Sequence, residues 1–346
     1  MAITDLKSRT HKILSAIIQS YAESAVPIGS EFLLERYRFG VSPATIRNIM
    51  AGLEEQGLVT HPHTSAGRVP TDLGYRYYVD LLMEPTRLRP DEEDLLEGLA
   101  RASVEDPAAF LEQAADLLAE LTHEAGVVLV PQLAQGSFRH LELIPMDPQE
   151  VIGVLIATEG MVKHATMELH QPVEQEELNR IERFLNEELS GMPLNQIGTY
   201  LDQSLLEATD SFFHLYKRAL DLLSLALLFQ DQPSLILEGT SQVFEAPEFR
   251  DIHRTRRLLK ALEKEEDLAG ILQKDLAADE VKLHIGAENR GTFLTDCTIV
   301  AAAFRLRGGV TGAIGVLGPT RIDYPRVTAL VGKIAQRVTQ AFSGRE

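Results

Sequence analysis

The chain has 346 residues, of which 45% are hydrophobic and 24% charged, a composition typical of globular rather than disordered proteins. This length predicts two or three domains. A single cysteine, Cys297, excludes an internal disulfide, and the most apolar run, residues 222–229, is far too short to span a bilayer. Because the N-terminus also lacks the apolar core of a signal peptide, we expect a cytoplasmic protein with no membrane contact.

The net charge of −18 argues against nucleic-acid binding by the chain as a whole, because DNA affinity depends on cations that meet phosphates. The charge is unevenly distributed, however. Residues 1–90 hold ten Lys or Arg and nine Asp or Glu, so the acidic excess lies entirely after this segment. The sequence therefore predicts that any contact with DNA is made by the N-terminal part.

The first 85 residues predict three helices, a short hairpin and a fourth helix. Ser42 and Pro43 open the third helix as N-cap and first helical residue, and Gly57 stands where a left-handed residue ends it. Residues 58–61 and 68–69 are β-prone and flank a turn-rich loop, and Thr71 is a cap for the fourth helix.

The third helix indicates function. Its apolar residues cluster on one side, which we expect to pack against the first helix. The other side carries Ala44, Thr45, Arg47 and Asn48. Small residues let a helix approach the major groove, whereas Arg and Asn pair bidentately with guanine and adenine edges. We expect Arg47 and Asn48 to read bases with help from Thr45, and Ser42 to hold a phosphate.

The loop at residues 61–68 would then form a wing. His63, Thr64, Ser65 and Arg68 are the side chains that we expect to contact the DNA backbone or minor groove. From periodicity alone, a helical packing module that touches no nucleic acid stays an open alternative.

The remainder predicts an α+β domain with a long insertion. Strand-like segments within residues 91–171 resume within 277–346, after about a hundred mostly helical residues at 172–276.

Five segments match a pattern that is far more specific than a generic helix-turn-helix, above all the long run from Pro62 to Asp72. They are residues 40–48, 53–58, 62–72, 74–80 and 318–324. Through these segments the sequence closely resembles the HrcA family of heat-inducible transcription repressors. Ile49 departs from the family pattern, in which we expect an acidic residue in many relatives.

This resemblance implies a layout and a set of partners. The layout is a winged helix-turn-helix domain (1–85), a GAF-like α/β domain in two segments (91–171 and 277–346) and a mostly helical inserted dimerisation domain (172–276). The implied activity is repression of chaperone genes by a homodimer bound to an inverted-repeat operator in double-stranded DNA, relieved by heat. The chaperonin GroEL is the implied protein partner.

Other candidate sites are weak. His61 and His63 lack a neighbouring Cys or carboxylate, and the glycines between 308 and 318 do not lie at a strand-to-helix turn, so we expect no metal or nucleotide cofactor. Arg321 is interpreted as an interdomain contact, with a ligand anchor as the alternative. No nucleophile or paired-acid constellation indicates an enzyme. The rival function is a winged-helix regulator controlled by a small molecule in the GAF-like domain.

Overall fold

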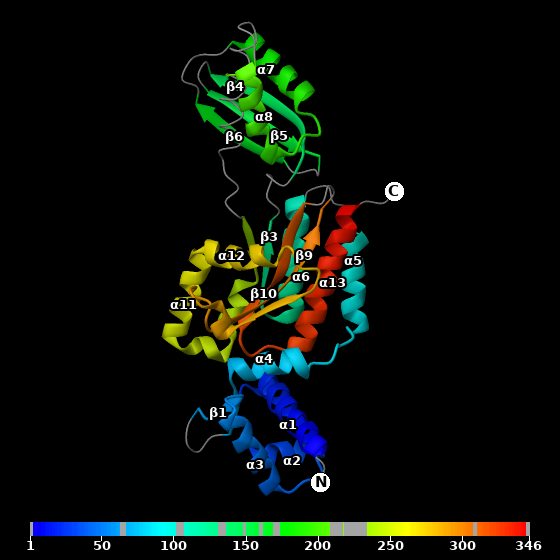
Figure 1. Cartoon of the computed structure of the whole chain (residues 1–346), viewed down its shortest axis with the longest axis vertical. Helices are drawn as coiled ribbons and strands as arrows, with labels where there is room; N and C mark the ends of the chain where they lie inside the picture. The colour runs from blue at the N-terminus through cyan, green and yellow to red at the C-terminus, as the bar shows by residue number, and fades with distance from the viewer. Residues whose placement is uncertain are drawn as a thin grey trace.

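Three lobes follow one another along the long axis of the computed structural model (Figure 1). The structure describes residues 3–62, 67–101, 107–130, 136–147, 150–158, 162–168, 174–207, 217, 234–306 and 310–343. The N-terminal lobe comprises the described residues up to 81, the central lobe those of 90–130 and 234–343, and the inserted lobe those of 136–207. The expected mixed α+β class is confirmed.

The N-terminal lobe has helices, a two-stranded antiparallel sheet and a final helix in the predicted order. Buried side chains of the first helix, such as Leu14 and Ile17, belong to the same core as Ile46 and Leu53 of the third. The elements are α1 (Ile3–Ser24), α2 (Ser30–Arg36), α3 (Pro43–Glu55), β1 (Val59–Thr60), β2 (Val69–Pro70) and α4 (Asp72–Leu81).

The central lobe is a five-stranded antiparallel sheet of order β7-β3-β10-β9-β8, covered by helices on both faces (Figure 1). One face packs against α5, α6 and α13, and the other against α10 to α12. The strands are β3 (Ala125–Leu129), β7 (Leu235–Glu238), β8 (Lys282–Ile285), β9 (Cys297–Arg305) and β10 (Thr311–Pro319). The helices are α5 (Pro90–Arg101), α6 (Pro107–Thr122), α10 (Thr240–Glu245), η2 (Pro247–Arg250), α11 (Ile252–Glu263), α12 (Glu265–Asp275), η3 (Gly286–Asn289) and α13 (Tyr324–Ser343).

The inserted lobe separates β3 from β7 in the chain. Its three-stranded antiparallel sheet, of order β4-β5-β6, has its own core with two helices. Leu141 and Leu155 of the sheet pack there with Leu178 and Leu185 of the helices. The elements are β4 (Phe138–Asp147), β5 (Glu150–Ala157), β6 (Val162–Glu168), α7 (Gln175–Glu188) and α8 (Leu194–Glu207).

The boundaries between the central and inserted lobes differ from the domain boundaries that the sequence predicts. Strands β4 to β6, expected in the domain segment 91–171, pair with one another and not with β3. Residues 235–275, expected in the insertion 172–276, instead complete the five-stranded sheet and cover one of its faces. The cause is physical, because alternating hydrophobicity shows that a segment is a strand but not which sheet it joins.

Candidate nucleic-acid interface

Helix α3 presents a polar face to solvent. Ser42 accepts a hydrogen bond from the backbone N–H of Thr45 at 3.2 Å and caps the helix, with Pro43 as its first residue. Ile46 is fully buried, whereas Arg47 and Asn48 are exposed. The predicted division of the helix into a packing side and an open side is thus confirmed, and Ala44 is exposed as well.

Arg47 is held only by weak contacts. Its Nε donates to Ser30 Oγ at 3.2 Å, and its Nη2 lies 3.3 Å from Glu31 Oε1. The two charged side chains are 63% and 81% exposed, so water screens their attraction. Because the pair is so exposed, the guanidinium can exchange Glu31 for another pair of acceptors, such as N7 and O6 of a guanine, at little cost.

A hollow of about 370 Å³ lies beside the exposed face of α3. Thr45, Asn48 and Gln56 line it from α3 and its C-terminus, and Arg9 lines it from α1. The sequence analysis assigned α1 only to packing and did not place Arg9 beside α3. The available signal was a cation on the first turns of a helix that packs against α3.

The base of the hairpin is fixed to α3 by Arg68. Its Nη2 lies 2.7 Å from Glu54 Oε2, and its Nη1 lies 2.8 Å from His61 Nδ1. The side chain is only 16% exposed. Gly67 lets the hairpin lie directly against the Ile28 backbone, because a Cβ there would come within 2.4 Å of it. In this structure Arg68 therefore anchors the hairpin and does not point to solvent as a DNA contact would.

The remaining predicted wing residues, His63, Thr64 and Ser65, lie outside the described residues. The structure brings the other predicted contacts together at the N-terminal half of α3. Ser42 Oγ and Thr45 Oγ1 lie 3.0 Å apart there, next to the exposed Arg47 and Asn48.

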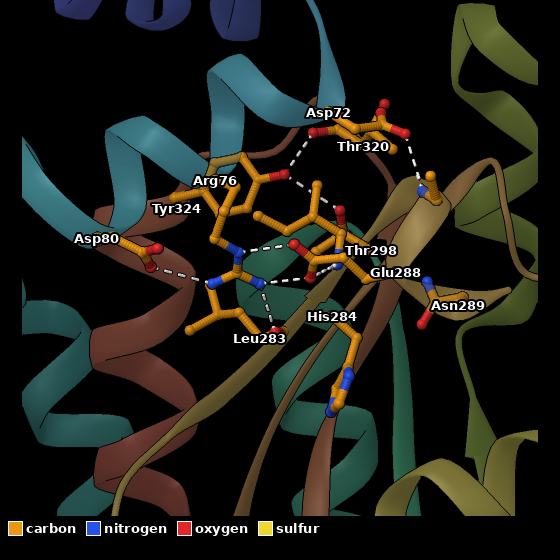
Figure 2. A network of polar contacts seen from close by, with 12 residues as sticks. Asp72, Arg76, Asp80, Leu283, His284, Glu288, Asn289, Thr298, Thr320 and Tyr324 are labelled. Atoms are coloured by element: carbon orange, nitrogen blue, oxygen red, sulfur yellow. Dashed lines mark hydrogen bonds and ion pairs between the residues drawn. The ribbon is translucent and has the colours of Figure 1, made fainter.

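Helix α4 fastens this lobe to the central lobe through Arg76 (Figure 2). Arg76 Nε donates to Glu288 Oε1 and its Nη2 to the carbonyl of Leu283, each at 2.7 Å, while Nη1 reaches Asp80 at 3.2 Å. One turn earlier, Asp72 accepts from the backbone N–H of Ala287 at 2.8 Å. The position of α3 is thereby tied to the edge strand β8 and to η3.

Arg321 makes a second connection between the same lobes. Its guanidinium pairs with Glu248, at 2.5 Å for Nε, and its Nη1 donates to the carbonyl of Ala22 in α1 at 2.6 Å. The interpretation of Arg321 as an interdomain contact is confirmed.

Within the described residues, no group of three His, Cys, Asp or Glu side chains has the arrangement of a metal site. Over the same part of the chain, none of the helices combines the length and apolarity needed to cross a membrane.

Comparison with known proteins identifies relatives over the whole chain. The family model described as "HrcA protein C terminal domain" matches residues 108–328. A protein of Symbiobacterium thermophilum named "Heat-inducible transcription repressor HrcA" is 35% identical over 97% of this chain and 98% of its own length. A protein of the same name from Geobacter sulfurreducens is 35% identical over 99% of this chain and 100% of its own length.

A crystal structure described only as that of a hypothetical protein has the same fold, with a TM-score of 0.60. It is 23% identical and covers 97% of this chain and 98% of its own.

Proposed function

Because the chain belongs to the HrcA family of heat-inducible transcription repressors, we propose that it represses heat-shock (chaperone) genes by binding operator DNA through its N-terminal lobe. The observation that carries this proposal is the exposed face of α3, where Arg47 and Asn48 stand on a capped, well-packed helix. A helix of this kind fits the major groove, and Arg47 is only weakly tethered.

The contacts divide by role. Arg47 and Asn48 read base edges, with Thr45 beside them, and Ala44 lets the helix approach. Ser42 and Arg9 hold phosphates at the two ends of the groove contact, together with the wing residues His63, Thr64 and Ser65. Arg68 contributes by fixing the base of the wing, since its guanidinium is occupied by Glu54 and His61.

The operator is an inverted repeat bound by a homodimer. One copy offers one recognition helix, so a two-fold pair reads two half-sites whole turns apart, about 34–36 Å per turn of DNA. In this proposal the N-terminal lobe is a winged helix, the central lobe is GAF-like, and the inserted lobe carries the dimer contact. The repressor acts in the cytoplasm, with GroEL as its chaperone partner and heat as the signal that releases the operator.

The test is binding of the purified full-length protein to an inverted-repeat chaperone-operator duplex and to a scrambled duplex, followed by fluorescence anisotropy across a salt series. We expect at least about a thousandfold preference for the operator and a steep loss of affinity with salt. Equal, weak binding to both duplexes, with and without chaperonin, would contradict the proposal.

Arg47→Ala sharpens this test. It is expected to weaken operator binding by about 1–3 kcal/mol and to relax the base preference at one position of each half-site. The matched control is Arg36→Ala, which removes another exposed arginine, on α2, paired with Glu23 of α1, and is expected to leave the base preference unchanged. If Arg47→Ala weakened binding to all duplexes equally, Arg47 would be a phosphate contact only.

A further inference from the structure

Helix α11 is basic, although it belongs to the acidic part of the chain. Residues 250–264 hold six Lys or Arg and two Asp or Glu, whereas the whole chain has a net charge of −18. An average over all residues after 90 conceals this local excess of positive charge. The six cations are Arg250, Arg254, Arg256, Arg257, Lys260 and Lys264.

Basic side chains form a stripe along one side of this helix. Leu258 and Ala261 are buried and turn another side of α11 to the core of the central lobe. At about 100° per residue, five basic side chains fall within one sector of about 100°. All of them are exposed except Arg257, which is half-buried. This basic stripe consists of His253, Arg256, Arg257, Lys260 and Lys264.

Most of the basic stripe has no negative partner within the chain. Only Arg257 is paired, with its Nη2 2.5 Å from Asp296 Oδ2. The Nζ atoms of Lys260 and Lys264 each lie 5.5 Å from the centroid of the Phe293 ring. Within the described residues, these two lysines and Arg256 form no ion pair. Two ammonium groups therefore share one aromatic ring without a carboxylate between them.

The stability of the helix does not explain this arrangement. His253 and Arg254 stand in the first turn, where the helix dipole disfavours cations. Lys260 and Lys264 are a like-charge pair one turn apart, which is also destabilising. Only Lys260, in the last turn, gains from the dipole. Unpaired cations that cost the fold stability, gathered on one exposed stripe, indicate a partner of negative charge.

The basic stripe lies on the side of the central lobe that connects to the DNA-binding lobe. The short helix η2 directly precedes α11, and its Glu248 holds Arg321, whose Nη1 donates to the carbonyl of Ala22 in α1. Figure 1 shows α11 at the left edge of the central lobe, on the same side of the view as β1 at the base of the hairpin. DNA held by α3 and the hairpin is thus the polyanion that approaches this side of the molecule.

We propose that the basic stripe of α11 binds the phosphate backbone of the DNA beside the half-site that α3 reads, without reading its sequence. This contact rests on the operator binding proposed above. Arginine and lysine are the side chains that meet phosphate oxygens. The stripe is about 16 Å long at 1.5 Å per residue, enough to meet several phosphates, since one strand carries a charge about every 3.4 Å along the DNA axis.

The test is fluorescence anisotropy of the full-length protein with operator and scrambled duplexes across a salt series. The duplexes extend about ten base pairs, one helical turn, beyond each half-site. In the double variant Arg256→Gln/Lys260→Gln, we expect binding to both duplexes to weaken by the same factor, about tenfold at low salt. The slope of log affinity against log salt should fall by about 2, because two phosphate contacts are lost. The preference for the operator should not change, in contrast to Arg47→Ala.

Two further variants separate this contact from general attraction between the protein and DNA. The matched control is Arg180→Gln/Arg183→Gln, which removes two exposed arginines from α7 in the inserted lobe and should bind like the parent. Arg256→Lys keeps the charge and should keep the parent's affinity and salt slope, because a phosphate contact needs a cation and not a particular fork of donors. Thermal melts of all variants verify that they are folded.

Each alternative outcome has a distinct signature. A parent that prefers the operator, with a double variant that keeps the parent's salt slope, would overturn the contact by the basic stripe and leave the proposed function standing. A parent without preference would contradict the proposed function and this contact with it. Equal weakening in the α7 control would show general attraction only. Unchanged DNA binding together with easier dissociation of the dimer in sedimentation velocity would assign the stripe to an acidic protein surface instead.

Discussion

At the scale of single residues, Arg47 on the exposed face of α3 is held by weak contacts, whereas the base of the hairpin is held by stronger ones. The exposed Arg47–Glu31 pair costs little to break, whereas the Arg68–Glu54 pair at the base of the hairpin is shielded, with Arg68 only 16% exposed. The exposed side chain of Arg47 can therefore change partners, whereas the base of the hairpin is fixed.

Ser42 illustrates the scaffold. Its hydroxyl caps α3 by accepting from Thr45 N–H, so Ser42→Ala is expected to destabilise the start of the helix by about 1 kcal/mol. Hydrogen–deuterium exchange over α3 should therefore quicken in Ser42→Ala and recover in Ser42→Asn, because asparagine also caps. If exchange over α3 in Ser42→Ala were as slow as in the parent protein and in Ser42→Asn, the cap would contribute nothing.

At the scale of elements, α4 has two functions. Tyr75 and Tyr78 bury one side of it in the hydrophobic core, while Asp72 and Arg76 reach the β8–η3 turn of the central lobe. A change in the docking of α4 therefore reaches α3 through α1, because α1 contacts both helices.

Arg76→Ala tests this coupling. Losing the bonds to Glu288 and Leu283 is expected to cost about 1–2 kcal/mol, discounted because Glu288 is 36% exposed. Hydrogen exchange should quicken both in α4 and in residues 282–289. Arg305→Ala, which breaks the exposed pair with Asp279 elsewhere on the central lobe, is the control. Faster exchange in α4 alone would contradict a shared contact.

The carboxyl group of Glu92 at the start of α5 is expected to make the stability of the fold depend on pH. Burial by itself raises the pKa of Glu92, but the Arg89 backbone N–H and the Arg326 guanidinium more than offset this and hold the pKa below its usual value. A carboxyl group whose pKa is lower in the folded state than in the unfolded state stabilises the fold. This contribution is complete at a pH above the unfolded-state pKa and is lost as the pH falls through the folded-state pKa.

Glu92→Gln should thus lower the free energy of unfolding by about 2 kcal/mol at neutral pH, since it leaves two arginines without their carboxylate. The difference from the parent should shrink below about pH 4, where the parent also loses the charge. Thermal melts from pH 3 to pH 7 measure this, with Glu112→Gln as control. A difference independent of pH would rule out the carboxylate as the cause.

At the scale of the whole molecule, we expect heat to act on the polar contacts that join the N-terminal lobe to the central lobe. Native proteins are stable by only about 5–15 kcal/mol, so a modest change in temperature can shift a large share of molecules out of the binding form. As the temperature rises, operator affinity is expected to fall at least about tenfold before the protein reaches its main unfolding transition. On one sample, fluorescence anisotropy gives the midpoint temperature of operator release and circular dichroism gives that of unfolding. Full affinity up to the unfolding temperature would refute a heat switch of this kind.

Much of the N-terminal lobe could be predicted from the sequence. The caps at Ser42 and Thr71 bond to residues three positions away, and the buried and exposed sides of α3 follow its 3.6-residue period. Such features depend on short stretches of chain, so composition and spacing determine them. The family resemblance rests on the same local segments, and for the same reason it identified the repressor family.

Only the tertiary structure decided which distant segments meet. Arg76 and Glu288 lie 212 positions apart, β7 pairs with β3 across the inserted lobe, and Arg68 turns to Glu54 instead of to solvent. The periodicity of a segment is the same whichever other segment of the chain it packs against. Loop closure and packing select one of these possible partners, and they depend on the folded chain as a whole.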